Sequence, residues 1–233
     1  MIEGGQSWHL ERQQGPARRL HGRSVALAGV EADGARTVRV LQVDRPALVL
    51  GSSQPESDVD TVAAEAAGVD VVRRRSGGAA VLVDPAAVVW VDLIVPAGDP
   101  LWEADVGMAG WWVGDAWAAA LDGVGAGPAQ VWRGPMQSSA WSARVCFAGV
   151  GPGEILIGAR KLVGISQRRT RGAALFQTAA LLTWDPAALL ALLHLDAGER
   201  AQGLADLERV AVGVGTQRGE ALVAALLAAL PPL

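Results

Sequence analysis

The stretch "GARKLVGISQRR", residues 158–169, contains Lys161, which is the only lysine of the chain because every other cationic residue is an arginine. The part from residue 160 onward is typical of a β-strand. Arginine serves an exposed surface as well as lysine does, whereas a narrow site beside a carbonyl or phosphate oxygen favours a compact ammonium. We therefore interpret Lys161 as a functional residue; the alternative is an ordinary surface ammonium.

Strands and helices are expected on both sides of this segment. Runs rich in β-branched residues predict strands at 37–43, 46–51, 88–96, 129–134, 143–150, 154–158 and 173–177, and two more within 69–85 that flank a loop. Apolar spacing and capping signals predict helices at 57–68, 102–121, 185–195 and from 216 onward. The strands cluster in the middle without a regular βαβ alternation. We therefore predict an α+β fold with a mixed, mostly antiparallel β-sheet flanked by helices.

Length and composition favour one sizeable domain. We expect an irregular N-terminal arm (1–34), a main domain (35–198) and a C-terminal helical segment packed on that domain (199–233). A net charge of −4 gives no field that would attract nucleic acid or an anionic membrane. The single cysteine excludes an internal disulfide, and the sequence shows neither a signal peptide nor a membrane span, so we expect a cytoplasmic protein. The three scattered histidines make a metal site improbable.

Two glycine-containing segments are further candidates. "RRRSGG" (73–78) places arginines and a serine before a glycine pair, which lets the backbone approach a ligand and turn its N–H groups toward an anion. The alternative is a tight hairpin with solvated arginines. "GSSQ" (51–54) follows a strand and by itself indicates a turn.

Taken in order, three motifs resemble those of the lipoate–protein ligase A/octanoyltransferase family. They are "GSSQ" (51–54), "RRRSGGAAV" (73–81) and "ARKLVGISQRR" (159–169), and the resemblance covers roughly residues 37–195. It implies a catalytic domain of the biotin/lipoate protein ligase type, with an acyl tunnel floored by the Ser-Gly-Gly loop. It also implies that Lys161 contacts the acyl carbonyl. Because a narrow apolar channel disfavours a charged ammonium, we expect a partner that keeps it charged: the carboxylate or phosphate of the substrate, a backbone carbonyl, or a nearby acid such as Asp84. The implied substrate-binding residues are Gly51, Gln54, Arg74, Arg75, Ser76, Gly77, Gly78, Ala79, Gly164 and Ser166.

The chain departs from the family pattern at three places. Ala79 stands where the family has a third glycine, Val83 precedes Asp84 where the family has His-Asp, and Gln177 stands where His-Gly usually follows the lysine strand. A non-catalytic member that binds lipoate or another acyl group is therefore one alternative.

The resemblance implies two chemistries for the attachment of a lipoyl or octanoyl group to a carrier lysine. A ligase uses ATP and Mg²⁺ to form an acyl-adenylate, and the arginines of "RRRSGG" and "QRRTR" favour this reading because phosphate is their natural partner. A transferase needs no cofactor and takes octanoate from acyl carrier protein. In one branch the acyl group passes through a cysteine in a Cys-Phe pair upstream of the lysine strand, and Cys146 is followed here by Phe147. A buried structural cysteine is the alternative for Cys146.

The resemblance also implies the partners. The acceptors are lipoyl carrier domains, either of 2-oxoacid dehydrogenase subunits or of the glycine cleavage H protein, and acyl carrier protein is a further partner of a transferase. On both readings lipoate or octanoate is the acyl group.

Overall fold

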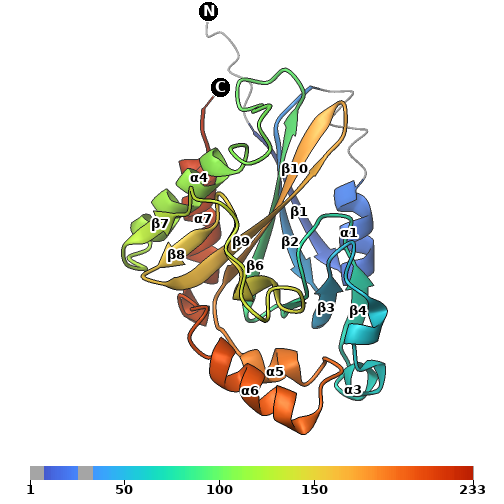
Figure 1. Ribbon diagram of the computed structural model, residues 1–233. Helices are drawn as coiled ribbons and strands as arrows, with labels where there is room; N and C mark the ends of the chain where they lie inside the picture. Colours follow the sequence, from blue (N-terminus) through green and yellow to red (C-terminus); the bar gives the residue numbers. More distant parts are fainter. Residues whose placement is uncertain (1–7, 26–33, 233) are drawn as a thin grey trace, which may run out of the picture.

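The computed structural model describes residues 8–25 and 34–232, which form two β-sheets with helices around them (Figure 1). The large sheet has the strand order β1-β2-β6-β10-β9-β8-β7, and the small sheet has the order β4-β3-β5. The strands are β1 (His9–Gly15), β2 (Thr37–Val43), β3 (Ala47–Leu50), β4 (Asp70–Arg73), β5 (Val81–Val83), β6 (Val88–Pro96), β7 (Ala129–Val131), β8 (Ile155–Ile157), β9 (Arg160–Arg169) and β10 (Ala173–Leu181).

The pairing within the two sheets confirms the predicted mixed, mostly antiparallel architecture. Only β1–β2 and β3–β4 are parallel pairs, and the other pairs are antiparallel. The α-helices are α1 (Ala17–Val25), α3 (Thr61–Ala66), α4 (Trp111–Gly123), α5 (Pro186–Leu190), α6 (Ala197–Leu207) and α7 (Gly219–Ala229). Within residues 8–25 and 34–232, each helix is too short or too polar to cross a membrane.

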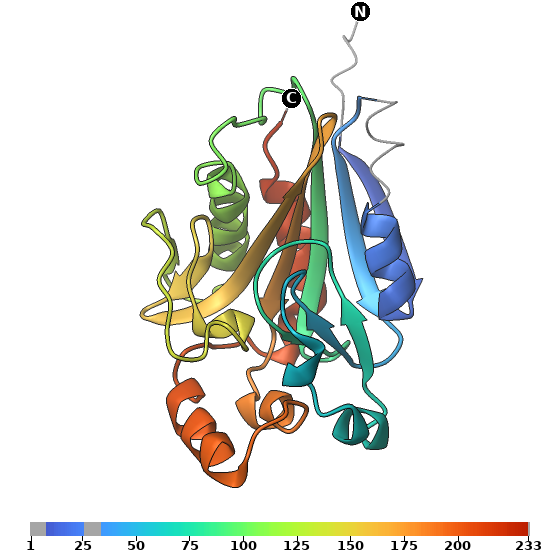
Figure 2. The same cartoon turned by 45° about the vertical axis from the view of Figure 1, so that its right-hand side comes forward.

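The core lies on both faces of the large sheet. Every residue of β6 is buried, because α4 and α7 cover one face of the sheet while α1 and the small sheet cover the other (Figure 2). Trp117 of α4 and Leu226 of α7 lie in the first of these two cores, and Leu20 of α1 lies in the second. A strand that is buried on both faces consists almost entirely of apolar residues, as β6 does apart from Asp92.

Three local predictions are wrong. The N-terminal arm is not irregular where it is described, because β1 adds a parallel strand beside β2 and α1 follows it. The strand predicted at 143–150 is instead a 3₁₀ turn, Cys146–Ala148, which touches the small sheet through a single bridge from Val145 to Ala80. The helix predicted over 102–121 begins only at Trp111, since turns occupy the residues before it.

Close packing of Gly114 against the backbone of Gly153 fixes α4 against the edge of the large sheet. A methyl group added at Gly114 would lie 2.4 Å from the carbonyl oxygen of Gly153 and 2.7 Å from Cγ1 of Val131. At Gly123, in the last turn of the same helix, the nearest atom would be Cβ of Ala225 at 3.9 Å. Alanine would therefore clash with the backbone at position 114 and fit without a clash at position 123.

We predict that Gly114→Ala lowers the free energy of unfolding by about 1–3 kcal/mol, because the backbone of Gly153 cannot yield without moving the helix. Gly123→Ala should leave stability unchanged or raise it by up to about 1 kcal/mol, since alanine favours the helical state. Denaturant unfolding of both variants measures the difference. Equal effects at the two sites would contradict the packing described here.

Candidate functional site

The loop between β4 and β5 is built around Arg74. This buried guanidinium donates to the carbonyl oxygens of Gly77 at 2.8 Å, Ala79 at 3.0 Å and Val49 at 3.4 Å. Gly78 has a positive φ of 97°, which favours glycine there. Arg74 therefore holds the Ser-Gly-Gly loop in shape from the inside.

Gly51 packs against this loop from behind, and Gln54 lies in the same turn as Gly51. A methyl group at Gly51 would lie 1.7 Å from the carbonyl oxygen of Gly78, so only glycine allows the loop to approach so closely. Gln54 is buried and donates to Asp58 and to the carbonyl of Arg144. Both residues thus contact the protein itself, whereas the exposed Arg75 faces solvent.

A row of polar side chains crosses the large sheet and ends at Ser76 of the loop. Strand register places Ser166 opposite Gln177 and Gln177 opposite Asp92. The Ser76 hydroxyl lies 2.9 Å from that of Ser166 and donates to Gln177 Oε1 at 2.8 Å. Register continues the row through Arg39, which pairs with Glu11 of β1. Gln177, a departure from the family pattern, therefore anchors the loop.

Two residues further along each strand, the sheet is apolar. Gly164 lies opposite Ala179, and Ala179 lies opposite Trp90. The imidazole of His21 packs on Trp90 with ring centroids 4.4 Å apart. A cavity of about 50 Å³ lies over these residues, and its other walls include Val49, Val81, Val83, Cys146 and Phe147. The sheet thus presents a narrow, mostly apolar space directly beside the polar row.

Lys161 lies in a closed polar cluster, with only 1% of its surface exposed. Its ammonium pairs with Glu154 at 2.6 Å and donates to the carbonyl oxygens of Gly149 at 3.0 Å and Cys146 at 3.1 Å. The Glu154 carboxylate also accepts from the amides of Gly151 and Ile165. All three hydrogens of the ammonium therefore have acceptors, and both oxygens of the acid have donors.

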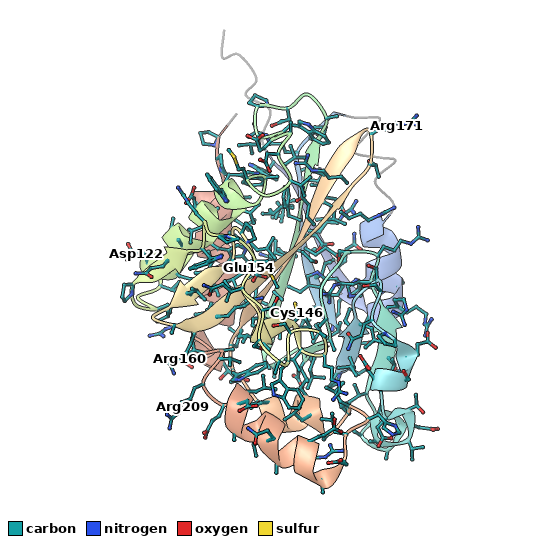
Figure 3. All side chains as sticks on the ribbon, viewed as in Figure 1. Asp122, Cys146, Glu154, Arg160, Arg171 and Arg209 are labelled. Carbon is teal, nitrogen blue, oxygen red and sulfur yellow. The ribbon has the colours of Figure 1, made fainter. Side chains whose placement is uncertain are left out.

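Cys146 lies at the junction of two spaces. It lines the narrow apolar cavity and also an outer cavity of about 260 Å³, which includes Gly78, Lys161 and Ser166 in its walls. Its amide donates to the carbonyl of Ala80 at 2.9 Å, and its sulfur lies 3.9 Å from a guanidinium nitrogen of Arg74. Cys146 and Glu154, labelled in Figure 3, lie close together at the centre of that view. An acyl group on this sulfur would have the apolar cavity on one side and the outer cavity on the other.

The structure brings most of the predicted site residues into one place. The outer cavity is lined by Gly77, Gly78, Ala79, Cys146, Lys161 and Ser166, and the inner one by Arg74, Cys146, Gly164 and Ser166. Backbone carbonyls, one of the partners expected for the Lys161 ammonium, are present, whereas Asp84 instead accepts from the amide of Ala86. Sequence reasoning missed Glu154. Glu154 is the only acidic residue in the hairpin segment 154–169 that carries Lys161, and this could have identified it as the partner of the lysine. His21 was also missed, because α1 was expected to be irregular.

Known proteins with similar sequences agree with these motifs. The family model described as "Lipoyl protein ligase A/B catalytic domain" matches residues 23–213. The octanoyltransferase LipM of Kyrpidia tusciae is 30% identical over 177 residues, which cover 73% of this chain. The chain spans 63% of the length of this curated relative.

Solved structures share the fold. A bipartite lipoate protein ligase from Thermoplasma acidophilum, described with its E2 lipoyl domain, has a TM-score of 0.70 at 19% identity, covering 97% of this chain and 84% of that one. A lipoate–protein ligase A bound with ATP has a TM-score of 0.69 at 18% identity, covering 96% and 83%. The predicted likeness to lipoate ligase catalytic domains is thereby confirmed for the fold.

We predict that His21 makes the protein less stable in mild acid. Burial first, and the positive charge of Arg74 second, lower the pKa of His21 from 6.5 to about 3. Below pH 6.5 the unfolded chain binds a proton at this residue that the folded protein does not bind until about pH 3, so stability falls as the pH falls between these values. From pH 7 to pH 5 this amounts to about 2 kcal/mol.

Unfolding free energies at the two pH values measure this effect. His21→Phe keeps a ring on Trp90 and removes the titrating group, so its stability should depend less on pH than that of the natural protein. The exposed His194 provides the control, and His194→Gln should keep the natural pH dependence. An unchanged slope in His21→Phe would refute the assignment.

We predict that the Lys161–Glu154 pair contributes to folding. Glu154→Gln leaves a buried ammonium without its counter-charge and should cost about 3–5 kcal/mol. Lys161→Met should cost a similar amount, and the double variant should be more stable than the sum of the two losses implies. Asp115→Asn, which breaks an exposed pair with Arg133, should cost about 1 kcal/mol or less. Additive losses at 154 and 161 would contradict the pairing.

Proposed function

The chain belongs to the lipoyl protein ligase A/B catalytic-domain family, and on that premise we propose that it transfers an octanoyl or lipoyl group to a carrier-domain lysine through a thioester on Cys146. The observation that carries the proposal is the position of Cys146 between the narrow apolar cavity and the outer cavity. The apolar cavity suits a hydrocarbon chain, and the outer cavity suits an approaching donor or acceptor.

The reaction has two balanced steps. In the first, the Cys146 thiolate attacks the carbonyl carbon of an acyl thioester on acyl carrier protein; a new thioester forms on Cys146, and the carrier's thiolate leaves. In the second, the neutral amine of the acceptor lysine attacks the thioester on Cys146. An amide bond forms, the Cys146 thiolate leaves, and the extra proton of the amine passes to that thiolate or to water.

The surrounding residues would prepare this site rather than react. Ser76, held by Ser166 and Gln177, fixes the loop whose following residues, Gly77 to Ala79, line the outer cavity. Lys161 donates hydrogen bonds to the carbonyls of Cys146 and Gly149. Its main role would therefore be to fix the position of the turn that carries the sulfur. An acyl carbonyl could accept from this ammonium only by replacing one of its three acceptors, which are these two carbonyls and Glu154. Within the described residues, the amides of Gly77, Gly78 and Ala79 make no hydrogen bond to the protein, so they are candidate donors to a thioester oxygen.

Several of the arginines that favour an ATP-dependent ligase are bonded to the protein itself, which weakens that argument. Arg73 donates to the carbonyls of Gly51 and Gln54, and Arg74 spends its donors on the loop that it supports. Arg169 donates to the carbonyls of Glu103 and Ala104. Arg171, at the far end of the β9–β10 hairpin, points away from Cys146 (Figure 3). The guanidinium groups of Arg73, Arg74 and Arg169 therefore serve the fold, whereas the exposed Arg75 of the same loop faces solvent.

We predict that wild-type protein mixed with octanoyl-acyl carrier protein carries one octanoyl group and then acylates a lipoyl carrier domain. Cys146→Ser should lose the enzyme-bound group and lower the transfer rate at least about a hundredfold, because a hydroxyl is a far weaker nucleophile than a thiolate. Intact mass spectrometry of enzyme and carrier domain, with a carrier domain lacking its acceptor lysine as control, measures both steps.

Other outcomes would overturn the proposal. Modification of the carrier domain from free octanoate or lipoate, dependent on ATP and Mg²⁺ and insensitive to Cys146→Ser, would identify a ligase. Tight binding of an acyl compound without transfer from either donor would identify a non-catalytic acyl-binding member of the family. The acyl donor, the dependence on ATP and the effect of Cys146→Ser therefore distinguish the three possible functions in a single set of reactions.

A further inference from the structure

A second chamber lies behind the apolar cavity next to Cys146. It measures about 260 Å³ and lies between the small sheet, β10 and α5, with Leu181, Trp184 and Ala188 among its walls. The two spaces share only two wall residues, Val81 and Phe147. These side chains therefore form the partition between them.

The ring of Phe147 is held firmly in this partition. It is 2% exposed, and its centroid lies 5.8 Å from that of Trp184 on the side of the second chamber. Toward the apolar cavity, its Cζ would lie 3.4 Å from a methyl group at Gly164. The Lys161 ammonium lies 5.0 Å from the ring centroid. Since these neighbours lie on β9 and in the segment between β10 and α5, on opposite sides of the ring, the ring has little freedom to swing aside.

We propose that Phe147 sets the length of the acyl group that the protein accepts, and this inference rests on the proposed transfer through Cys146. A chain bound to the sulfur of Cys146 runs into the apolar cavity, and the next residue in the sequence closes that cavity. A medium-length chain such as octanoyl ends at the ring, whereas a longer chain needs the space that the ring blocks. The substrate class is thus medium-chain acyl thioesters, with long-chain ones excluded.

The second chamber also explains why a partition is useful. Asp84, Thr183 and Asp185 lie on its rim, and the last two are exposed, so the chamber communicates with water. An open passage would let water approach a thioester on Cys146 from behind, and would allow long chains to compete for the site. An aromatic ring in the shared wall prevents both.

Substitution of the partition residue tests the proposal. Wild-type protein, Phe147→Ala, Ala188→Phe and the double variant Phe147→Ala/Ala188→Phe are each given octanoyl, dodecanoyl and hexadecanoyl groups on acyl carrier protein. The wild type should prefer octanoyl over dodecanoyl at least about tenfold in kcat/KM. Phe147→Ala should remove or invert this preference, since each further buried methylene favours binding by roughly fourfold.

Ala188→Phe supplies the matched control. It fills the second chamber from α5 without touching the apolar cavity, so by itself it should leave octanoyl transfer unchanged. In the double variant it should restore the octanoyl preference by refilling the space that Phe147→Ala opens. This restoration would show that the filled volume determines the chain-length preference, since the contact between the Phe147 ring and Lys161 is still absent in the double variant.

The outcomes also separate this inference from the proposed function. Transfer by the wild type at equal rates for all three chains, or an octanoyl preference that survives Phe147→Ala, would overturn the partition while the transfer stands. If the wild type transfers nothing, shifts in melting temperature with free octanoate and dodecanoate still test the partition in the same four proteins. Phe147→Leu opens the wall less and replaces Phe147→Ala if that variant does not fold.

Discussion

The buried ammonium of Lys161 is the contact on which the site depends. It draws together the 3₁₀ turn that carries Cys146, the carbonyl of Gly149 and the acid of Glu154. The backbone of Lys161 is in turn bonded to Val210 and Val212, in the segment between α6 and α7. A buried charge is stable only if all its hydrogen-bonding and ionic partners are in place. Displacement of any one of these segments would therefore destabilise the positions of the others.

The sheet contributes an equally strict constraint, because side chains on one face recur every second residue. That period places the polar group of Ser166 and the apolar surface of Gly164 two residues apart on β9, and their partners on β10 repeat the pattern as Gln177 and Ala179. The boundary between a polar floor and an apolar cavity therefore follows directly from strand register. A shift of one residue would exchange the faces and destroy both.

The sequence allowed the architecture to be predicted, because alternation and capping are local signals and three ordered motifs resembled one family. It also indicated the loop of Ser76, Lys161 and Cys146 as one site. The acidic partner of Lys161 could not be predicted, since Glu154 reaches it only through a hairpin whose register shifts between Ile155 and Leu156. The N-terminal strand was missed as well, because β1 is half exposed at the sheet edge and carries few apolar residues. Such contacts depend on tertiary neighbours that no local pattern specifies.

The contrast between one lysine and many arginines has a physical explanation that differs from surface filling. Arg74 is buried and bonds three carbonyls that lie around its planar fork, and the buried Arg36 bonds Asp99 together with the carbonyls of Pro231 and Pro232. The acceptors at Lys161 instead surround one point from three directions, which suits a compact ammonium. Arginine at this position would have to direct a flat group of five donors into that small space, beside Phe147 and Gly164. The acceptors around Lys161 therefore fit a lysine, whereas those around Arg74 and Arg36 fit an arginine.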